Sequence, residues 1–146
     1  MSFGVFIPFV SHLGFELTRF EGGESTIEFS PQAAHQNSFG VTHGGALMTL
    51  MDVTMASAAR SVTDGMGVVT IEMKTSFMRP APGDGSKLTG RGRLIHRSHT
   101  MAFTEATIYD SQGAICAHAT GTFKYVKRPP AEGESLYAPS QPISTD

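Results

Sequence analysis

A single charged residue, Asp52, lies in the run between Gly44 and Ala59, which otherwise holds only small, apolar and hydroxyl side chains. Apolar residues fall on nearly every side of a helical wheel drawn through this run, so a helix here has to be enclosed by other structure. Taking an unpaired carboxylate out of water costs several kcal/mol, so Asp52 needs a partner, a proton or a chemical task. The run therefore predicts a buried central helix that carries a functional carboxylate.

Length and charge narrow the class of protein and its partners. A chain of 146 residues suits one domain, which we place at residues 1–128. The formal charge of -2 and the pI near 6.3 disfavour nucleic acid as a partner, because contacts with a phosphate backbone need a basic surface. No apolar run reaches the roughly 20 residues of a membrane span.

The single cysteine, Cys116, excludes an intrachain disulfide. We therefore expect a cytoplasmic protein without a membrane partner.

The two ends of the chain differ in composition. The start is apolar but lacks the basic segment of an export signal, and Pro8 and Gly14 are typical of the start and end of a short helix over Phe9 to Leu13. Residues 129–146 hold four of the eight prolines together with serine, glycine and glutamate. Such a composition cannot bury enough apolar surface to fold, so we expect a disordered tail.

Runs of β-prone residues surround the predicted central helix. The Glu-Gly-Gly-Glu sequence around Gly22 and Gly23 predicts a tight hairpin turn. The links between the later runs are short, which favours antiparallel neighbours, and one apolar helix needs a sheet to cover it. We therefore expect an α+β fold in the order β-β-α-β-β-β-β, an antiparallel sheet wrapped around one long helix, with strands near residues 13–20, 25–30, 68–78, 87–97, 101–109 and 115–126.

Alternation along two strands predicts which side chains share a face. In the last strand, Ile115, Ala117, Ala119, Phe123 and Tyr125 alternate with Cys116 and mostly polar residues, which indicates one dry face and one wetter face. In an earlier strand, a set of cations recurs at even spacing, and we interpret it as one solvated face: Lys87, Arg91, Arg93 and Arg97.

The residues around the predicted helix start have the chemistry for acyl transfer. Unpaired N–H groups at a helix N-terminus polarise a carbonyl oxygen as it gains negative charge, and glycine at Gly44 lets a substrate approach closely. Asp52 has the chemistry to activate water as a general base or to attack the carbonyl itself, while Asn37 or His43 donates a hydrogen bond to the carbonyl.

The spacing of these groups leads to a prediction about assembly. Eight residues of helix separate Gly44 from Asp52, which is about 12 Å along the axis at ~1.5 Å per residue. One thioester cannot span that distance. Two such helices packed antiparallel about a twofold axis would set Gly44 of one chain beside Asp52 of the other, so we predict a homodimer with two identical sites.

The segment from Asn37 through His43-Gly44-Gly45 to Asp52 resembles the hotdog-fold acyl-CoA thioesterases, most closely the phenylacetate-pathway subgroup of the 4-hydroxybenzoyl-CoA thioesterase superfamily. The resemblance extends over roughly residues 7–126 and includes Phe77 to Ala81 and Thr100 to Phe103. It implies that Asp52 is the catalytic carboxylate, that the Gly44 N–H binds the thioester oxygen, and that Asn37 contacts water or the carbonyl.

The resemblance also implies supporting roles. Thr70 matches a serine or threonine that supports the attacking water in relatives. The coenzyme A contacts of relatives, made across the subunit boundary, map to Met78, Arg79, Pro80, Arg97, Ser98, His99, Thr100 and Lys124. This chain departs from the pattern at Ser98-His99, where relatives often carry Gly-Lys; the change predicts a weaker or pH-dependent phosphate contact, for which Arg97 or Arg79 would compensate.

Structural roles compete with each functional one. Asp52 also suits a structural role, as a carboxylate hydrogen-bonded to a neighbouring chain. His43 also suits the role of a helix cap, and Thr70 that of an ordinary strand residue. No spacing of His and Cys predicts a metal site, and we expect no cofactor beyond the coenzyme A of the substrate.

The predicted activity is hydrolysis of an aryl or medium-chain acyl-CoA to the free acid and coenzyme A; the alternatives are a non-catalytic acyl-CoA sensor and a hotdog dehydratase. The acyl group, pairing of dimers into tetramers, and general-base against anhydride chemistry stay open.

Overall fold

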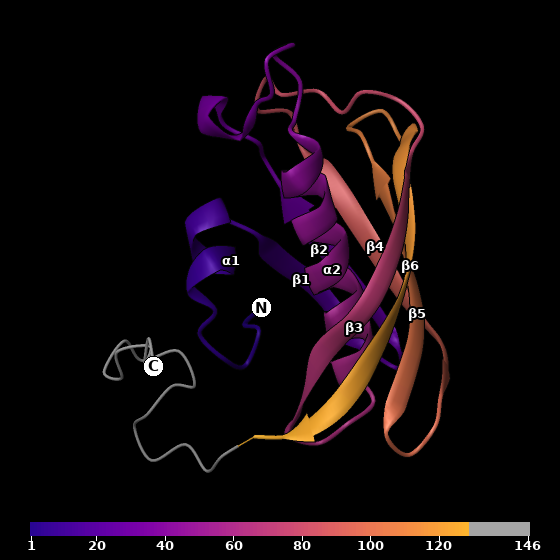
Figure 1. The fold of residues 1–146 in the computed structure, drawn as a ribbon. Helices are drawn as coiled ribbons and strands as arrows, with labels where there is room; N and C mark the ends of the chain where they lie inside the picture. Colours follow the sequence, from indigo (N-terminus) through magenta and orange to yellow (C-terminus); the bar gives the residue numbers. More distant parts are fainter. Residues whose placement is uncertain (129–146) are drawn as a thin grey trace, which may run out of the picture.

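The computed structural model describes residues 1–128 as one antiparallel sheet curved around one long helix (Figure 1). The predicted order of elements and the α+β class are confirmed. The predicted tail, residues 129–146, lies outside the described residues. The elements are α1 (Pro8–Leu13), β1 (Glu16–Glu21), β2 (Glu24–Phe29), the 3-10 turn η1 (Ala33–His35), α2 (Gly44–Arg60), β3 (Met66–Phe77), β4 (Leu88–Arg97), β5 (Met101–Tyr109) and β6 (Ile115–Lys127).

The sheet has the strand order β1-β2-β4-β5-β6-β3, with every neighbouring pair antiparallel. The first hairpin turns at Gly22 and Gly23, both at positive φ as the sequence predicts. Although β3 directly follows α2 in the chain, it joins the sheet beside the last strand, β6, and forms one of the two edges. Within residues 1–128, the outer edge of β3 pairs with no other strand.

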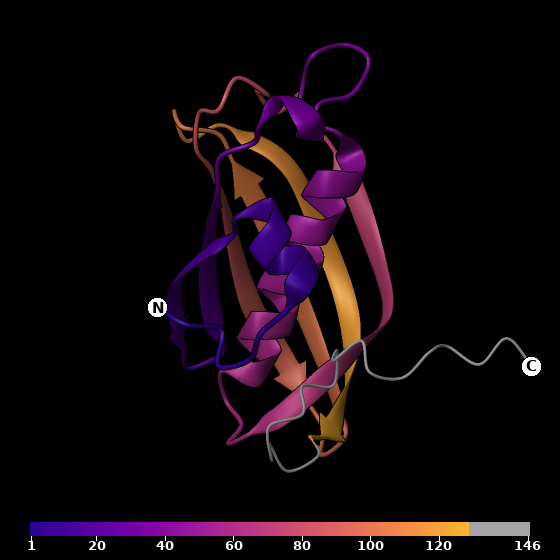
Figure 2. The same cartoon turned by 90° about the vertical axis from the view of Figure 1, so that its left-hand side faces the viewer.

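Helix α2 lies in the concave face of the sheet, as both views show (Figures 1 and 2). Leu50, Met51 and Met55 are fully buried between helix and strands. Two glycines of β4 allow the helix to approach: a Cβ atom at Gly92 would lie 2.6 Å from the carbonyl oxygen of Thr54, and one at Gly90 2.8 Å from the Thr54 hydroxyl. The helix therefore sits closer to β4 than any side chain on that face would permit.

Two irregularities in the sheet overturn parts of the predicted alternation. Between β4 and β5 the pairing steps from Leu94 to His96, so one extra residue moves Arg97 to the helix side, where its guanidinium lies 4.2 Å from the ring centre of Tyr125. The predicted single face of four cations is therefore wrong for Arg97.

The second irregularity lies near the start of β6. The pairing of β5 with β6 steps from Ala117 to Ile115, so Cys116 is the extra residue. Cys116 is buried, whereas Ile115 is 44% exposed, which reverses the predicted faces at these two positions. From Ala117 onward the predicted dry face is confirmed, because Ala119, Phe123 and Tyr125 are all buried.

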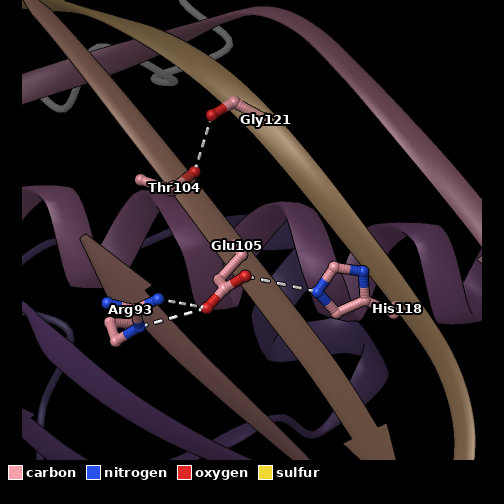
Figure 3. A network of polar contacts seen from close by, with 5 residues as sticks. All are labelled: Arg93, Thr104, Glu105, His118 and Gly121. Carbon is pink, nitrogen blue, oxygen red and sulfur yellow. Dashed lines mark hydrogen bonds and ion pairs between the residues drawn. The ribbon is translucent and has the colours of Figure 1, made fainter. Parts of the chain in front are cut away.

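The outer face of the sheet carries a polar network that joins three strands (Figure 3). Arg93 on β4 donates two hydrogen bonds, of 2.6 and 3.1 Å, to Glu105 on β5, and His118 Nε2 on β6 lies 3.5 Å from the other carboxylate oxygen. The hydrogen bond from Arg93 holds the pKa of Glu105 below its usual range. The neighbouring Thr104 turns inward and donates to the carbonyl of Gly121 at 2.8 Å.

We predict that Gly92→Ala destabilises the fold, because its methyl group would overlap the Thr54 carbonyl and the Ser25 hydroxyl. Inserting one carbon into a tightly packed interior costs about 1–3 kcal/mol, to be measured as the change in free energy of unfolding by urea. Arg91→Ala, on the outer face of the same strand, serves as the control with a change within about 0.5 kcal/mol. Equal stabilities for the two variants would contradict the close contact.

Candidate functional site

Asp52 lies halfway along α2, on the side of the helix that faces β3. Its Oδ1 atom accepts a 2.7 Å hydrogen bond from the hydroxyl of Thr70. Burial raises the pKa of the Asp52 carboxyl, and the hydrogen bond from Thr70 offsets part of that rise because it stabilises the ionised form. The structure thus brings together two of the predicted site residues and makes the carboxylate a stronger base than an exposed aspartate.

The Asp52 carboxylate borders a pocket of about 310 Å³. The pocket wall is mostly apolar and comes from four segments of the chain: the N-terminal residues, α2, the first half of β3, and Arg128 just after β6. Val5 and Ile7 of the N-terminal segment belong to this wall, although no motif in the sequence points to them. The one sequence signal was the apolar composition of the first ten residues.

The start of α2 leaves one backbone amide without a partner. His43 caps the helix: its Nδ1 atom accepts from the Gly45 N–H at 2.8 Å, and its carbonyl accepts from Ala46 and Leu47. The Gly44 N–H has no acceptor within residues 1–128. A free amide at the positive end of a helix dipole is suited to bind a carbonyl oxygen or an anion.

Asn37 shapes the loop before the helix. Its Oδ1 atom accepts from the backbone N–H of Phe39 at 2.9 Å and of Val41 at 3.3 Å, so the side-chain carbonyl is used within the loop. The Nδ2 group remains as a donor. Asn37 and Gly44 line a second pocket, of about 610 Å³, together with Arg79 and Pro80.

The predicted coenzyme A contacts fall into two groups at opposite ends of α2. Arg79 and Pro80 follow β3 and lie with Gly44 at the helix N-terminus. The turn of residues 97–100 and Lys124 lie together at the other end: Lys124 pairs with Met101, and the Tyr125 N–H donates to the Thr100 carbonyl at 2.8 Å (Figure 1). Within this second group, Arg97 stacks on Tyr125 and donates to the Ser98 carbonyl at 3.2 Å.

The candidate residues of one chain therefore lie in two separate pockets. The first, with Asn37, Gly44 and Arg79, offers hydrogen-bond donors and a cation. The second, with Asp52 and Thr70, offers a base and an apolar pocket. Across residues 1–128, no three His, Cys, Asp or Glu side chains gather as metal ligands would, and no helix has the length and apolarity to cross a membrane.

Comparison with known proteins identifies the fold and the family. The model of the thioesterase superfamily matches residues 39–117. The proofreading thioesterase EntH of Klebsiella pneumoniae is 32% identical over 108 residues, which cover 73% of this chain and 77% of that protein. A conserved protein from Pseudomonas aeruginosa has a similar structure with a TM-score of 0.78 at 28% identity, covering 84% of this chain and 96% of that one.

The PaaI protein from the phenylacetic acid degradation operon of E. coli superimposes with a TM-score of 0.77 at 22% identity, covering 82% of this chain and 85% of that one. At this identity the likeness shows the fold. The family match includes Gly44 at the helix start, Asp52 and Thr70, whereas Asn37 lies just before it. With its six-stranded antiparallel sheet around one helix, the chain has the hotdog fold and belongs to the thioesterase superfamily.

Proposed function

We propose that this thioesterase hydrolyses an acyl-CoA at a site shared by two copies of the chain, with Asp52 of one copy and the Gly44 amide of the other acting on the same thioester. The observation that carries the proposal is the division of the chemistry between two pockets of one chain. The donor that would hold the thioester oxygen lies in one pocket, and the base lies in the other.

The chemistry of the proposed site is hydrolysis by a carboxylate. Ionised Asp52 takes a proton from water as the water oxygen bonds to the thioester carbon, and Thr70 helps to hold the water and the carboxylate. The carbonyl oxygen gains negative charge, which the Gly44 N–H stabilises. When the tetrahedral intermediate collapses, the C–S bond breaks and the proton passes from Asp52 to the leaving thiolate, which gives the free acid and coenzyme A. Direct attack by Asp52 and hydrolysis of an anhydride would use the same groups.

The open edge of β3 supports a dimer. Side chains along and just beyond this strand are apolar and exposed: Val69 at 46%, Ile71 at 53%, Phe77 at 52% and Met78 at 59%. An unpaired edge strand with such side chains is a surface that proteins normally cover. Pairing two copies of β3 in antiparallel fashion about a twofold axis would cover it in both chains and set the two helices antiparallel.

The same pairing would assemble a coenzyme A site. Lys124 pairs with Val69 near the start of β3, whereas Arg79 follows the end of β3. Because antiparallel pairing places the start of one strand beside the end of the other, Arg79 of one copy would approach the turn of residues 97–100 and Lys124 of its partner. These cations would face the phosphates of the coenzyme. An aryl or medium-chain acyl group fits the apolar pocket beside Asp52.

Release of free thiol from a panel of acyl-CoAs tests the activity and the role of Asp52. We expect turnover by the wild type, and a loss of kcat of roughly 10²- to 10⁴-fold in Asp52→Asn, which keeps the shape of the side chain but removes the base. Circular dichroism and urea unfolding check that the variant is folded. Binding of acyl-CoA without thiol release in the wild type would instead favour the non-catalytic sensor.

The hydrogen bond between Thr70 and Asp52 leads to a prediction on pH dependence. The bond stabilises the ionised carboxylate, so Thr70→Val should raise the pKa of Asp52 further. The acidic limb of the kcat/KM profile, which requires ionised Asp52, should then move to higher pH. Thr122→Val, which removes a hydroxyl on the outer face, is the matched control. A limb that stays in place or moves to lower pH would contradict the assignment.

The Gly44 amide can be removed without changing the helix. Proline is favoured at the first position of a helix, and His43 already has the extended backbone, with φ -61° and ψ 138°, that precedes proline. Gly44→Pro should lower kcat by about 10²- to 10³-fold through loss of one N–H donor. Gly44→Ala keeps the N–H and adds a Cβ atom at ordinary contact distance, 3.4 Å, from the ring of Phe77, so it measures the steric part alone.

Mixing the purified Asp52→Asn protein with the purified Gly44→Pro protein then tests whether the site is shared between two chains. If each site takes Asp52 from one chain and Gly44 from the other, subunit exchange yields mixed dimers with one intact site and one doubly altered site. With half of the dimers mixed, about a quarter of the wild-type activity should return. If both residues serve the same site from one chain, no activity above that of the parent variants will return.

A further inference from the structure

The N-terminal residues 3–7, here called the N-terminal strap, lie against α2 from the side opposite the sheet. The carbonyl of Phe3 accepts a 2.8 Å hydrogen bond from Arg60 at the end of α2, which fixes one end of the strap. The other end leads into α1, whose Val10 and Leu13 are buried in the core. Figures 1 and 2 both place α1 beside α2 and away from the sheet. The strap is therefore held at both ends.

Two side chains of the strap face the pocket that contains the proposed base. Val5 and Ile7 line this pocket together with Asp52 and Thr70. The remaining wall includes Val53, Ala56, Val68 and Val69, and two arginines, Arg60 and Arg128. By contrast, Phe6, between the two pocket residues, is 63% exposed. The alternation along the strap therefore directs one set of side chains to the pocket and the other to solvent.

We infer that the N-terminal strap forms the acyl-binding wall of the site, so that Val5 and Ile7 set which acyl chains are hydrolysed; this inference rests on the proposed function. With the thioester carbon at Asp52, the coenzyme has to extend toward the solvent and the cations of the proposed coenzyme A site, Arg79, Arg97 and Lys124. The acyl group then has to enter the apolar pocket behind the carboxylate. Val5 and Ile7 are then specificity-determining residues that touch the acyl chain.

The size of the pocket indicates the class of acyl group. At about 310 Å³, it lies at the lower end of the range for small-molecule pockets, roughly 300 to 1,000 Å³. Short and medium acyl chains or a single aromatic ring suit it better than long fatty acyl chains. Each methylene of the acyl chain that is buried in such a pocket should increase kcat/KM by about fourfold until the pocket is full.

The test is the acyl-chain-length profile of kcat/KM, measured by thiol release on straight-chain acyl-CoAs from acetyl to dodecanoyl. In the wild type we expect a rise with chain length followed by a fall. Ile7→Ala and Val5→Ala should move the maximum to longer chains, and Ile7→Phe should move it to shorter chains. Inhibition by free coenzyme A should not change in any of them, because the strap contacts only the acyl part.

Phe9→Ala is the matched control, because Phe9 is a neighbouring apolar residue that is 57% exposed; its profile should equal that of the wild type. Urea unfolding verifies that each variant is folded, and the milder Ile7→Val replaces Ile7→Ala if the latter unfolds. Profiles with the same maximum in the Val5 and Ile7 variants as in the wild type overturn the inference while leaving the proposed function intact. A wild type that releases no thiol from any acyl-CoA overturns both.

Discussion

The contact between α2 and β4 holds the helix that carries both Gly44 and Asp52. Gly90 and Gly92 let the helix rest almost on the strand backbone, and the Ser25 hydroxyl donates to the Thr54 carbonyl at 2.6 Å in the same place. A helix held this closely has little freedom to shift or rotate. Asp52 is therefore held beside Thr70, and Gly44 beside Phe77, by packing that is remote from both.

The length of the helix then separates the donor from the base. Gly44 starts the helix and Asp52 lies about two turns further on, in a different pocket. A rigid helix cannot bring these two groups together, which is why the reaction centre proposed above draws on a second chain. The unpaired edge of β3 and its exposed apolar side chains are the surface available for that association. Helix length, sheet edge and chemistry thus support the same proposed dimer.

Much of this architecture was predictable from the sequence because its patterns are local. The isolated charge of Asp52 in an apolar run, the Gly22-Gly23 turn, and the Pro8 and Gly14 boundaries each report a backbone requirement within a few residues. The sheet irregularities were not predictable in the same way. An extra residue at Ile95 or Cys116 changes which face follows, and its position depends on the partner strand rather than on the alternation within its own strand.

The candidate site likewise contains some residues that the sequence predicts and others that it does not. Thr70 entered the predicted site through the family resemblance, and in the structure its hydroxyl donates to Asp52. The strap residues Val5 and Ile7 belong to no motif, because an apolar wall requires only size and shape, which many side chains supply. The separation of Arg79 from Lys124 depended on the strand order, which sets positions that are distant along the chain.

The cap formed by His43 has one more consequence. Since its Nδ1 atom accepts the hydrogen bond from Gly45, the neutral imidazole has to carry its hydrogen on Nε2. The cap thereby selects one tautomer and leaves the ring with one N–H donor, on Nε2. One ring nitrogen thus completes the helix cap, and the other remains a hydrogen-bond donor.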